Sequence, residues 1–284
     1  GVIDSMLLHQ IITCGEEKRI AFHGEPCITY GELRDEVARY RNYLYKAGIR
    51  RGENVGLLVR NSPAFVYAYM AIVSLGAVVV PINYQLTAQE VAFIIKDARM
   101  QNLVTANVME MAEPLAYHDY KETVKQHLIE RIGKSDYPAG EAAPAQDDLI
   151  SEEAPCTIVY TSGTTGNPKG AVLTHKSLVS DAVCYAQAMP VHETDNILCI
   201  LPLYHCLAWT CIILCGFLHK ASVTILDTFV PKEIIAGIRK FQVTVMYGVP
   251  SVYALLLKTA EADDMKSLRL FMSGGASLPQ RVAE

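Results

Sequence analysis

Residues 160–170 combine the side chains that a phosphate-binding loop needs. This stretch, Tyr160-Thr-Ser-Gly-Thr-Thr-Gly-Asn-Pro-Lys-Gly170, contains four aliphatic hydroxyls, three glycines and one lysine. Glycines let backbone N–H groups come close to an anion and form concave nests. The hydroxyls add hydrogen-bond donors, and Lys169 adds a compact positive charge. The segment therefore indicates a site for a polyphosphate.

The spacing within this segment excludes two common nucleotide motifs. A P-loop has Gly-Lys-Ser/Thr in direct succession, whereas two residues separate Gly166 from Lys169 here, and Gly170 stands where the magnesium-binding hydroxyl belongs. The glycine spacing also differs from that of the dinucleotide fingerprint. A flexible surface loop is the alternative interpretation. That alternative explains neither the single lysine nor the position directly after the apolar run 156–159, where open α/β sheets bind ligands.

Four segments together resemble the adenylate-forming superfamily, which includes acyl-CoA synthetases, luciferases and peptide-synthetase adenylation domains. Residues 160–170 resemble its phosphate loop. Leu201-Pro-Leu-Tyr-His-Cys206 resembles its aromatic-His substrate motif, and Tyr247-Gly-Val-Pro-Ser251 resembles its Val-Pro-Thr/Ser segment. Ser273-Gly-Gly-Ala-Ser-Leu278 resembles the strand end that lines the adenine. The resemblance covers essentially the whole chain and is closest to the fatty-acid–CoA ligases.

The resemblance implies an ATP-dependent ligase that activates a carboxylic acid, expected to be a fatty acid, and transfers it to a thiol. The carboxylate would attack the α-phosphate of ATP, and magnesium-bound pyrophosphate would leave. Such transfers need mainly positioning and charge neutralisation. The thiol of coenzyme A would then displace AMP. ATP, Mg²⁺ and coenzyme A are therefore the expected small-molecule partners, together with the acid, and no metal-binding side chains are assigned.

The resemblance also assigns roles to individual residues. Catalytic roles fall on Lys169 and His205. The expected nucleotide contacts are Thr161, Ser162, Gly163, Thr164, Thr165, Gly166, Lys169, Gly274, Gly275 and Ala276. The expected acid-binding residues are Tyr204, His205, Trp209, Gly248 and Pro250.

Each of these assignments has a plainer alternative. A lone histidine in an apolar run is more often a packed, hydrogen-bonded residue. Trp209 and Tyr204 can be core residues. The glycine pair after residue 273 can be a simple turn, and Pro250 can merely begin a helix. We expect His205 to position the substrate by polar contact rather than to act as a base, because a fatty carboxylate is already ionised.

Strand and helix signals alternate along the chain. Capping boxes at Thr29-x-x-Glu32 and Thr87-x-x-Glu90 begin helices, and Ser62-Pro63 begins another. Apolar runs predict buried strands at 55–59, 77–80, 156–159 and 268–272. Two further helices are predicted at 175–188 and 252–259. This alternation predicts an α/β fold with largely parallel sheets flanked by helices.

The resemblance implies how these elements divide into lobes. It predicts a large N-terminal domain of acyl-CoA synthetase type with two stacked lobes and a site where they meet. One lobe is expected at about residues 55–195, and the other at about 1–54 plus 196–284. The family pattern continues past Glu284, so we expect an incomplete domain, without the C-terminal cap domain, that is inactive by itself. Uncovered apolar surface would favour self-association, with a homodimer as one form.

Composition narrows the classes of partner and compartment. The 284 residues are 51% hydrophobic and 19% charged, with a net charge of −5. A core of good size is therefore possible, and the absence of a basic stripe argues against nucleic acid. None of the eight cysteines forms a C-x-x-C pair, which suits reduced thiols in the cytoplasm. Cys206, Cys211 and Cys215, with two nearby histidines, fit no common zinc spacing.

Residues 197–218 form an apolar run long enough to raise the question of a membrane span. Pro202 and His205 interrupt it, so a buried strand, a turn and a core helix are the preferred interpretation. The sequence shows no basic amphipathic helix of the kind that attaches a protein to a membrane surface. A location at the membrane periphery stays open, because the expected substrate is a fatty acid. Two other classes also remain open: a different adenylate-forming ligase, such as an aryl-acid ligase or a peptide-synthetase adenylation domain, and a non-catalytic nucleotide- or acyl-binding module.

Overall fold

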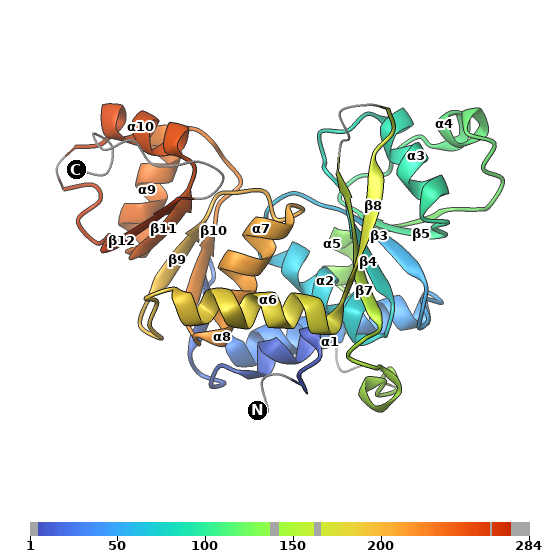
Figure 1. Ribbon diagram of the computed structural model, residues 1–284, viewed down its shortest axis with the longest axis horizontal. Coiled ribbons are helices and arrows are strands. Elements are labelled where there is room, and N and C mark those ends of the chain that lie inside the picture. The colour runs from blue at the N-terminus through green and yellow to red at the C-terminus, as the bar shows by residue number, and fades with distance from the viewer. Residues whose placement is uncertain (1–4, 137–141, 162–165, 262, 274–284) are drawn as a thin grey trace. The chain divides into compact units, whose positions relative to one another are not determined.

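The chain forms two packing units, each built on its own six-stranded sheet (Figure 1). The computed structural model describes residues 5–136, 142–161, 166–261 and 263–273. The first unit contains the described residues of the ranges 5–10, 34–60 and 64–180, and the second contains those of 11–33, 61–63 and 181–273. The predicted α/β fold with mostly parallel sheets is confirmed. The packing units divide the chain at other residues than the predicted lobes, since 5–10 and 34–54 pack in the first unit and 61–63 and 181–195 in the second. The division into lobes stays a prediction.

The first unit has a sheet that is parallel except at one edge. Its strands, in spatial order, are β6 (Lys125–Leu128), β5 (Asn102–Thr105), β3 (Asn54–Leu58), β4 (Val78–Pro81), β7 (Pro155–Thr161) and β8 (Lys169–Thr174). Among the described strands of this sheet, only the β7–β8 pair is antiparallel. The helices of this part of the chain are α1 (Tyr30–Lys46), α2 (Pro63–Ser74), α3 (Ala88–Asp97), α4 (Ala112–Tyr117), α5 (Ile129–Gly133) and the 3₁₀ turn η3 (Asp147–Leu149).

Helices cover both faces of this sheet. On one face α3 and α4 pack over β3, β4 and β5, beside which they lie in Figure 1. On the other face α2 is apolar all round and is buried from Phe65 to Ser74, as a helix inside a core must be. The Tyr40 ring of α1 packs edge-on against Tyr67 of α2, with 5.6 Å between ring centroids. The central strands therefore read as continuous apolar runs because both of their faces are covered.

The predicted helix boundaries of this unit rest on local chemistry that the structure shows. The Thr87 hydroxyl accepts from the Glu90 N–H at 3.3 Å, and the Glu90 carboxylate accepts from the Thr87 N–H at 3.0 Å, so the capping box is complete. Pro63 occupies the start of α2. Gly76, just past its end, has φ +76, a conformation that favours glycine.

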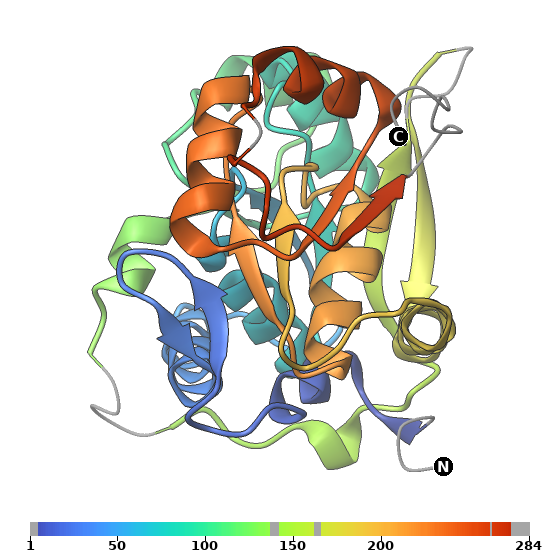
Figure 2. The ribbon, with the colours of Figure 1, turned by 90° about the vertical axis from the view of Figure 1, so that its left-hand side faces the viewer.

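The second unit repeats the arrangement with different connections (Figure 2). Its strands, in spatial order, are β12 (Leu270–Ser273), β11 (Val245–Gly248), β9 (Asn196–Cys199), β10 (Ser222–Ile225), β1 (Ile20–His23) and β2 (Ile28–Thr29). In the part of this sheet that the structure describes, only β1 and β2 pair antiparallel. Its helices are η2 (Leu8–Thr13), α6 (His175–Ala188), α7 (Cys206–Ala208), the π-helical turn η4 (Trp209–Leu214), α8 (Cys215–Leu218), α9 (Pro231–Phe241) and α10 (Pro250–Thr259), with η2 and α6 each beginning in the first unit.

Opposite faces of the second sheet receive different helices. The α9 and α10 helices pack over Leu198, Ile200 and Met246 on one face. On the other, α7, η4 and α8 run on as one helix, and Gly216 lies so close to the sheet that an added Cβ would be 3.2 Å from Val223 Cγ2. The preferred interpretation of residues 197–218 as a strand, a turn and a core helix is confirmed. No helix in the described part of the chain is long and apolar enough to span a membrane.

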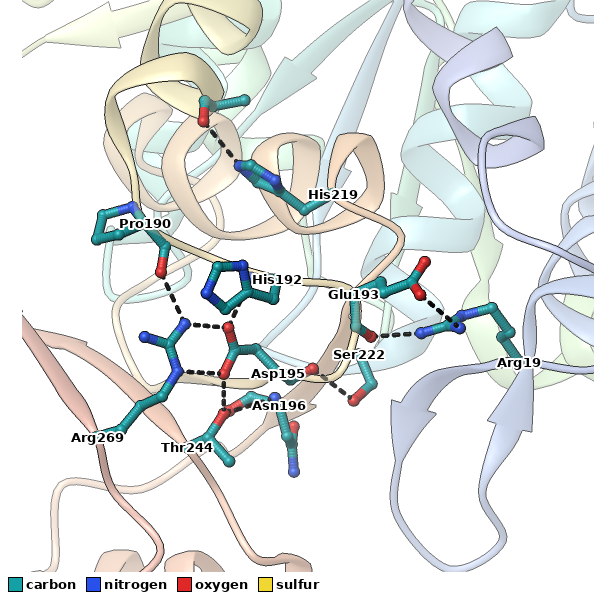
Figure 3. A network of polar contacts seen from close by, with 11 residues as sticks. Arg19, Pro190, His192, Glu193, Asp195, Asn196, His219, Ser222, Thr244 and Arg269 are labelled. Atoms are coloured by element: carbon teal, nitrogen blue, oxygen red, sulfur yellow. Dashed lines mark hydrogen bonds and ion pairs between the residues drawn. The ribbon is translucent and has the colours of Figure 1, made fainter.

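A buried carboxylate ties the amino ends of the second unit's strands together (Figure 3). The Asp195 side chain is 3% exposed and accepts from Arg269 Nε at 2.8 Å, Thr244 Oγ1 at 2.7 Å and the His192 N–H at 2.7 Å. Its backbone carbonyl accepts from the Ser222 N–H at 3.0 Å. Burial raises the pKa of Asp195, but these hydrogen bonds outweigh burial and lower the pKa to about 2. The carboxylate therefore stays charged and joins the segments that begin four parallel strands.

We predict that Asp195→Ala lowers the free energy of unfolding by about 2–4 kcal/mol, because the guanidinium of Arg269 and the Thr244 hydroxyl lose a buried partner. Urea denaturation monitored by circular dichroism measures the change. Lys134→Ala is the matched control, since its ammonium pairs with the exposed Glu130 at 2.7 Å, and such surface pairs contribute little. Equal losses for the two variants would contradict the structural role given to Asp195.

A fully buried imidazole lies where β8 enters α6. His175 is 0% exposed, and its Nδ1 accepts from the Leu8 N–H at 3.0 Å. Burial, followed by the nearby His9, lowers the pKa of His175 from its ordinary value of 6.5 to about 4. The neutral ring is therefore the native form at neutral pH.

This burial predicts a loss of stability in mild acid. Between pH 6.5 and about 4 the unfolded chain binds a proton at His175 that the folded chain does not, so stability falls as the pH falls through this window. In His175→Asn, which keeps an acceptor but cannot titrate, the slope of unfolding free energy against pH should be reduced. Denaturant titrations at a series of pH values measure this slope, and an unchanged slope in the variant would contradict the prediction.

Candidate functional site

Three of the four segments singled out from the sequence begin at the carboxyl ends of strands in the second unit's sheet. The side of a sheet formed by such strand ends is called its carboxyl-end edge. The strands β9, β11 and β12 are neighbours and run parallel, with Tyr247 opposite Cys199 and Gly248 opposite Ser273. Their carboxyl ends therefore lie side by side. Residues 201–206 follow β9, and Pro250 follows β11. In open parallel sheets ligands bind outside the carboxyl ends of the strands, so this edge is the first candidate site.

The aromatic-His segment places one exposed polar ring at this edge. His205 is exposed and caps α7, with its Nδ1 accepting from the Leu207 N–H at 3.3 Å. Tyr204 is half-buried beside it. Trp209 is 1% exposed and packs in the core, which agrees with the plainer of its two interpretations. The assignment of His205 and Tyr204 to acid binding stays a prediction, as does that of Trp209.

A buried amide that sequence reasoning missed holds this segment in place. Asn61 is 8% exposed; its Nδ2 donates to the Leu201 carbonyl at 2.9 Å, and its Oδ1 accepts from the Leu203 N–H at 2.9 Å. Both bonds fix the backbone that leads directly to Tyr204 and His205. The only signal in the sequence is a polar residue placed directly after an apolar run, and nothing there identifies partners about 140 residues away.

The β11 and β12 ends are joined by a tyrosine on α10. The Tyr253 hydroxyl donates to the Met246 carbonyl at 2.9 Å and contacts the Met272 carbonyl. Gly248 is buried, and an added Cβ would lie 3.4 Å from Tyr253 Cζ, an ordinary contact, so packing alone does not require glycine here. Pro250 is the first residue of α10. The predicted adenine contacts Gly274, Gly275 and Ala276 lie outside the described residues.

The predicted phosphate loop is the turn of the β7–β8 hairpin in the first unit. Thr161 and Lys169 form the last pair of the hairpin, and both are exposed. Gly166 has φ +100, a conformation that favours glycine. This strand–turn–strand geometry differs from the strand–loop–helix of a P-loop, which agrees with the exclusion made from the spacing. The predicted contacts Ser162, Gly163, Thr164 and Thr165 lie outside the described residues.

Two residues that were not singled out from the sequence, Arg60 and Tyr84, follow carboxyl ends of strands in the first unit's sheet, as the hairpin turn does. β7 pairs in parallel with β4, and β4 with β3, so the turn of the hairpin, Tyr84 after β4 and Arg60 after β3 all follow carboxyl ends of neighbouring strands. The Arg60 guanidinium carbon lies 4.5 Å from the centroid of the Tyr84 ring. With Lys169, this edge carries two cationic side chains, which suits an anionic ligand.

Cysteines on the long helix of the second unit do not resemble a metal centre. Burial raises the pKa of the Cys206, Cys211 and Cys215 thiols. Across the described ranges no group of three or more His, Cys, Asp or Glu side chains could hold a metal ion.

Comparisons with known proteins identify relatives for nearly the entire chain. A family model described as AMP-binding enzyme matches residues 14–284. A feruloyl-CoA synthase of an Amycolatopsis species is 32% identical over 267 residues, which cover 92% of this chain and 52% of the relative. A 4-coumarate–CoA ligase of Humulus lupulus is 29% identical over 277 residues, covering 90% of this chain and 49% of the relative.

A solved structure agrees with the fold. O-succinylbenzoate coenzyme A synthetase of Bacillus subtilis, in complex with AMP, superposes with a TM-score of 0.80 at 26% identity, covering 97% of this chain and 68% of that one. The chain spans about half the length of the curated relatives it matches. Because the family model covers residues 14–284, this chain belongs to the family of AMP-binding enzymes.

Proposed function

We propose that the complete protein containing this chain is an AMP-forming acid–CoA ligase. The family match over residues 14–284 carries the proposal. Its relatives with named activities are CoA ligases or CoA synthases. The hairpin turn with Lys169 and the sheet edge with His205 supply the two kinds of contact that such a reaction needs, one for phosphates and one for an acid.

The proposed chemistry converts a poor acyl donor into a good one. The ionised carboxylate attacks the α-phosphate of MgATP, and pyrophosphate leaves with the magnesium ion. Thr161, Gly166 and Lys169, together with the hydroxyls of residues 162–165, would hold the β- and γ-phosphates and neutralise their charge. His205 would orient the acid by hydrogen bonding, since the carboxylate needs no base. The thiol of coenzyme A then attacks the acyl carbonyl, and AMP leaves.

The class of acid has two candidates. The resemblance to fatty-acid–CoA ligases favours a fatty acid. The relatives described above carry the names of ferulate, 4-coumarate and o-succinylbenzoate, all of which contain an aromatic ring. These names favour an aromatic acid as the second candidate, and the coarser proposal of a carboxylic acid includes both.

A substrate panel tests this proposal. We predict that the complete protein exchanges labelled pyrophosphate into ATP only when a suitable acid is present, because adenylation is reversible before the thiol attacks. Saturated fatty acids of short to long chain form one arm, and hydroxycinnamates and benzoates form the other. The preferred arm assigns the acid class. Absence of exchange with every acid in both arms would reject the ligase proposal.

The role of the loop lysine can be tested separately. We predict that Lys169→Ala weakens ATP binding or turnover by about ten- to a hundredfold, as loss of a charge-assisted phosphate contact should. Lys176→Ala is the matched control, because it removes the same charge from an exposed ion pair with Glu153 on the same unit. Calorimetry with MgATP and the exchange rate measure the two effects, and a Lys169 variant that behaves like the control would reject the assigned role.

A further inference from the structure

The last residue of α3 is connected to the root of the phosphate loop by one hydrogen bond. The Tyr160 hydroxyl donates to Asp97 Oδ2 at 2.6 Å. Burial, followed by the bond to Asp97, raises the pKa of Tyr160, so the phenol keeps the proton that it donates. Tyr160 is the second-last residue of β7 and the first residue of the predicted loop 160–170. The bond therefore holds the residue at which the predicted loop begins.

The Tyr160 ring also clamps the returning strand. Tyr160 stands opposite Gly170 in the hairpin. A Cβ added at Gly170 would lie 3.0 Å from Tyr160 Cζ and 2.9 Å from Ile158 Cγ2, which is closer than side-chain atoms normally approach. The ring thus lies directly over the Gly170 backbone, and the absence of a side chain at Gly170 permits this contact.

The two faces of the β7–β8 hairpin carry different side chains: one packs toward α3, and the other carries predicted phosphate contacts. Along β7, Ile158 and Tyr160 pack toward the α3 side of the sheet, whereas Thr157 points to the other face, where its Oγ1 lies 2.5 Å from the Tyr69 hydroxyl. Alternation then places Thr161 on the Thr157 face, and its partner Lys169 shares that face. One face of the hairpin root is thus held by α3, while the opposite face presents two of the predicted phosphate contacts.

The anchor on α3 is itself rigid. Its first turn is closed by the capping box at Thr87 and Glu90, and Val91, Ile94 and Ile95 are buried in the core beneath the hairpin. Asp97 at the other end of the helix is exposed and bonds Tyr160 from this fixed position. A hydrogen bond from a rigid helix to a hairpin root restricts how far the hairpin can tilt.

We propose that Asp97 is a positioning residue for the phosphate loop: through Tyr160 and Gly170 it fixes the angle at which the β7–β8 hairpin presents Thr161 and Lys169 to ATP. This inference rests on the proposed function. Asp97 itself touches no substrate. Its loss leaves the fold intact, because the residue is exposed, but lets the hairpin root move, so binding of ATP must also fix the positions of Thr161 and Lys169.

The test compares variants that break the same bond from either side. Tyr160→Phe keeps the ring over Gly170 and loses only the hydroxyl, and Asp97→Ala loses the acceptor. Each should raise the KM for ATP and the Kd for MgATP by about three- to tenfold in the complete protein, with kcat and the KM for the acid little changed. The double variant should be no worse than either single one, since both lack one and the same bond. Asp97→Asn, which keeps an acceptor oxygen, should stay within about twofold of the wild type.

Tyr120→Phe is the matched control. Its hydroxyl donates to the Met100 carbonyl at 2.6 Å in the same core cluster but is not attached to the hairpin. Thermal unfolding of all variants verifies that each is folded. Unchanged ATP affinity in both Tyr160→Phe and Asp97→Ala would overturn the proposal, as would an equal loss in Tyr120→Phe or additive losses in the double variant.

Failure of the ligase proposal can be told apart from failure of this one. If the wild type binds MgATP but shows no exchange with any acid, the ligase proposal fails, while the Kd for MgATP of the variants still decides the role of Asp97. If the wild type binds no MgATP, both proposals fail.

Discussion

Parallel pairing of neighbouring strands is the constraint on which both candidate sites depend. When strands run parallel, every carboxyl end lies at the same sheet edge, and the loops that follow these ends become neighbours however far apart they are in sequence. Residues 201–206 and 249–250 follow two such ends in the second unit, where Ser273 is a third, and Arg60, Tyr84 and the β7–β8 hairpin lie at three in the first. A register shift in either sheet would separate these groups. Backbone hydrogen bonding between parallel strands therefore decides which loops lie side by side, whatever side chains these loops carry.

The two edges of the second sheet are built differently. Its amino-end edge is joined by the buried carboxylate of Asp195, which accepts hydrogen bonds from Arg269 and Thr244. Its carboxyl-end edge is held from beneath by Asn61 and Tyr253, whose bonds go to backbone carbonyls and N–H groups. Their side chains fix the direction of the loops, while His205 stays exposed. A rigid support beneath exposed polar groups is the arrangement expected of a binding site.

Local chemistry could be predicted from the sequence, and long-range partners could not. The capping box at Thr87, the helix start at Pro63 and the helix stop at Gly76 act over a few residues, so their spacing alone predicts the helix ends. The four motifs predict the fold class and the family. By contrast, Asn61 acts on residues about 140 positions away and Asp97 on a residue 63 positions away. A single sequence carries no signal for such pairs, and Trp209 shows the converse, since its place beside a motif does not reveal that its ring is buried in the core.

Mass spectrometry of the nucleotide and acyl products shows whether the complete protein activates an acid through its adenylate. With MgATP and the preferred acid but no thiol, we expect an acyl-adenylate bound to the protein. After addition of coenzyme A we expect acyl-CoA and AMP in equal amounts, with pyrophosphate as the other product. Release of ADP and orthophosphate, or formation of acyl-CoA without AMP, would rule out activation through an adenylate.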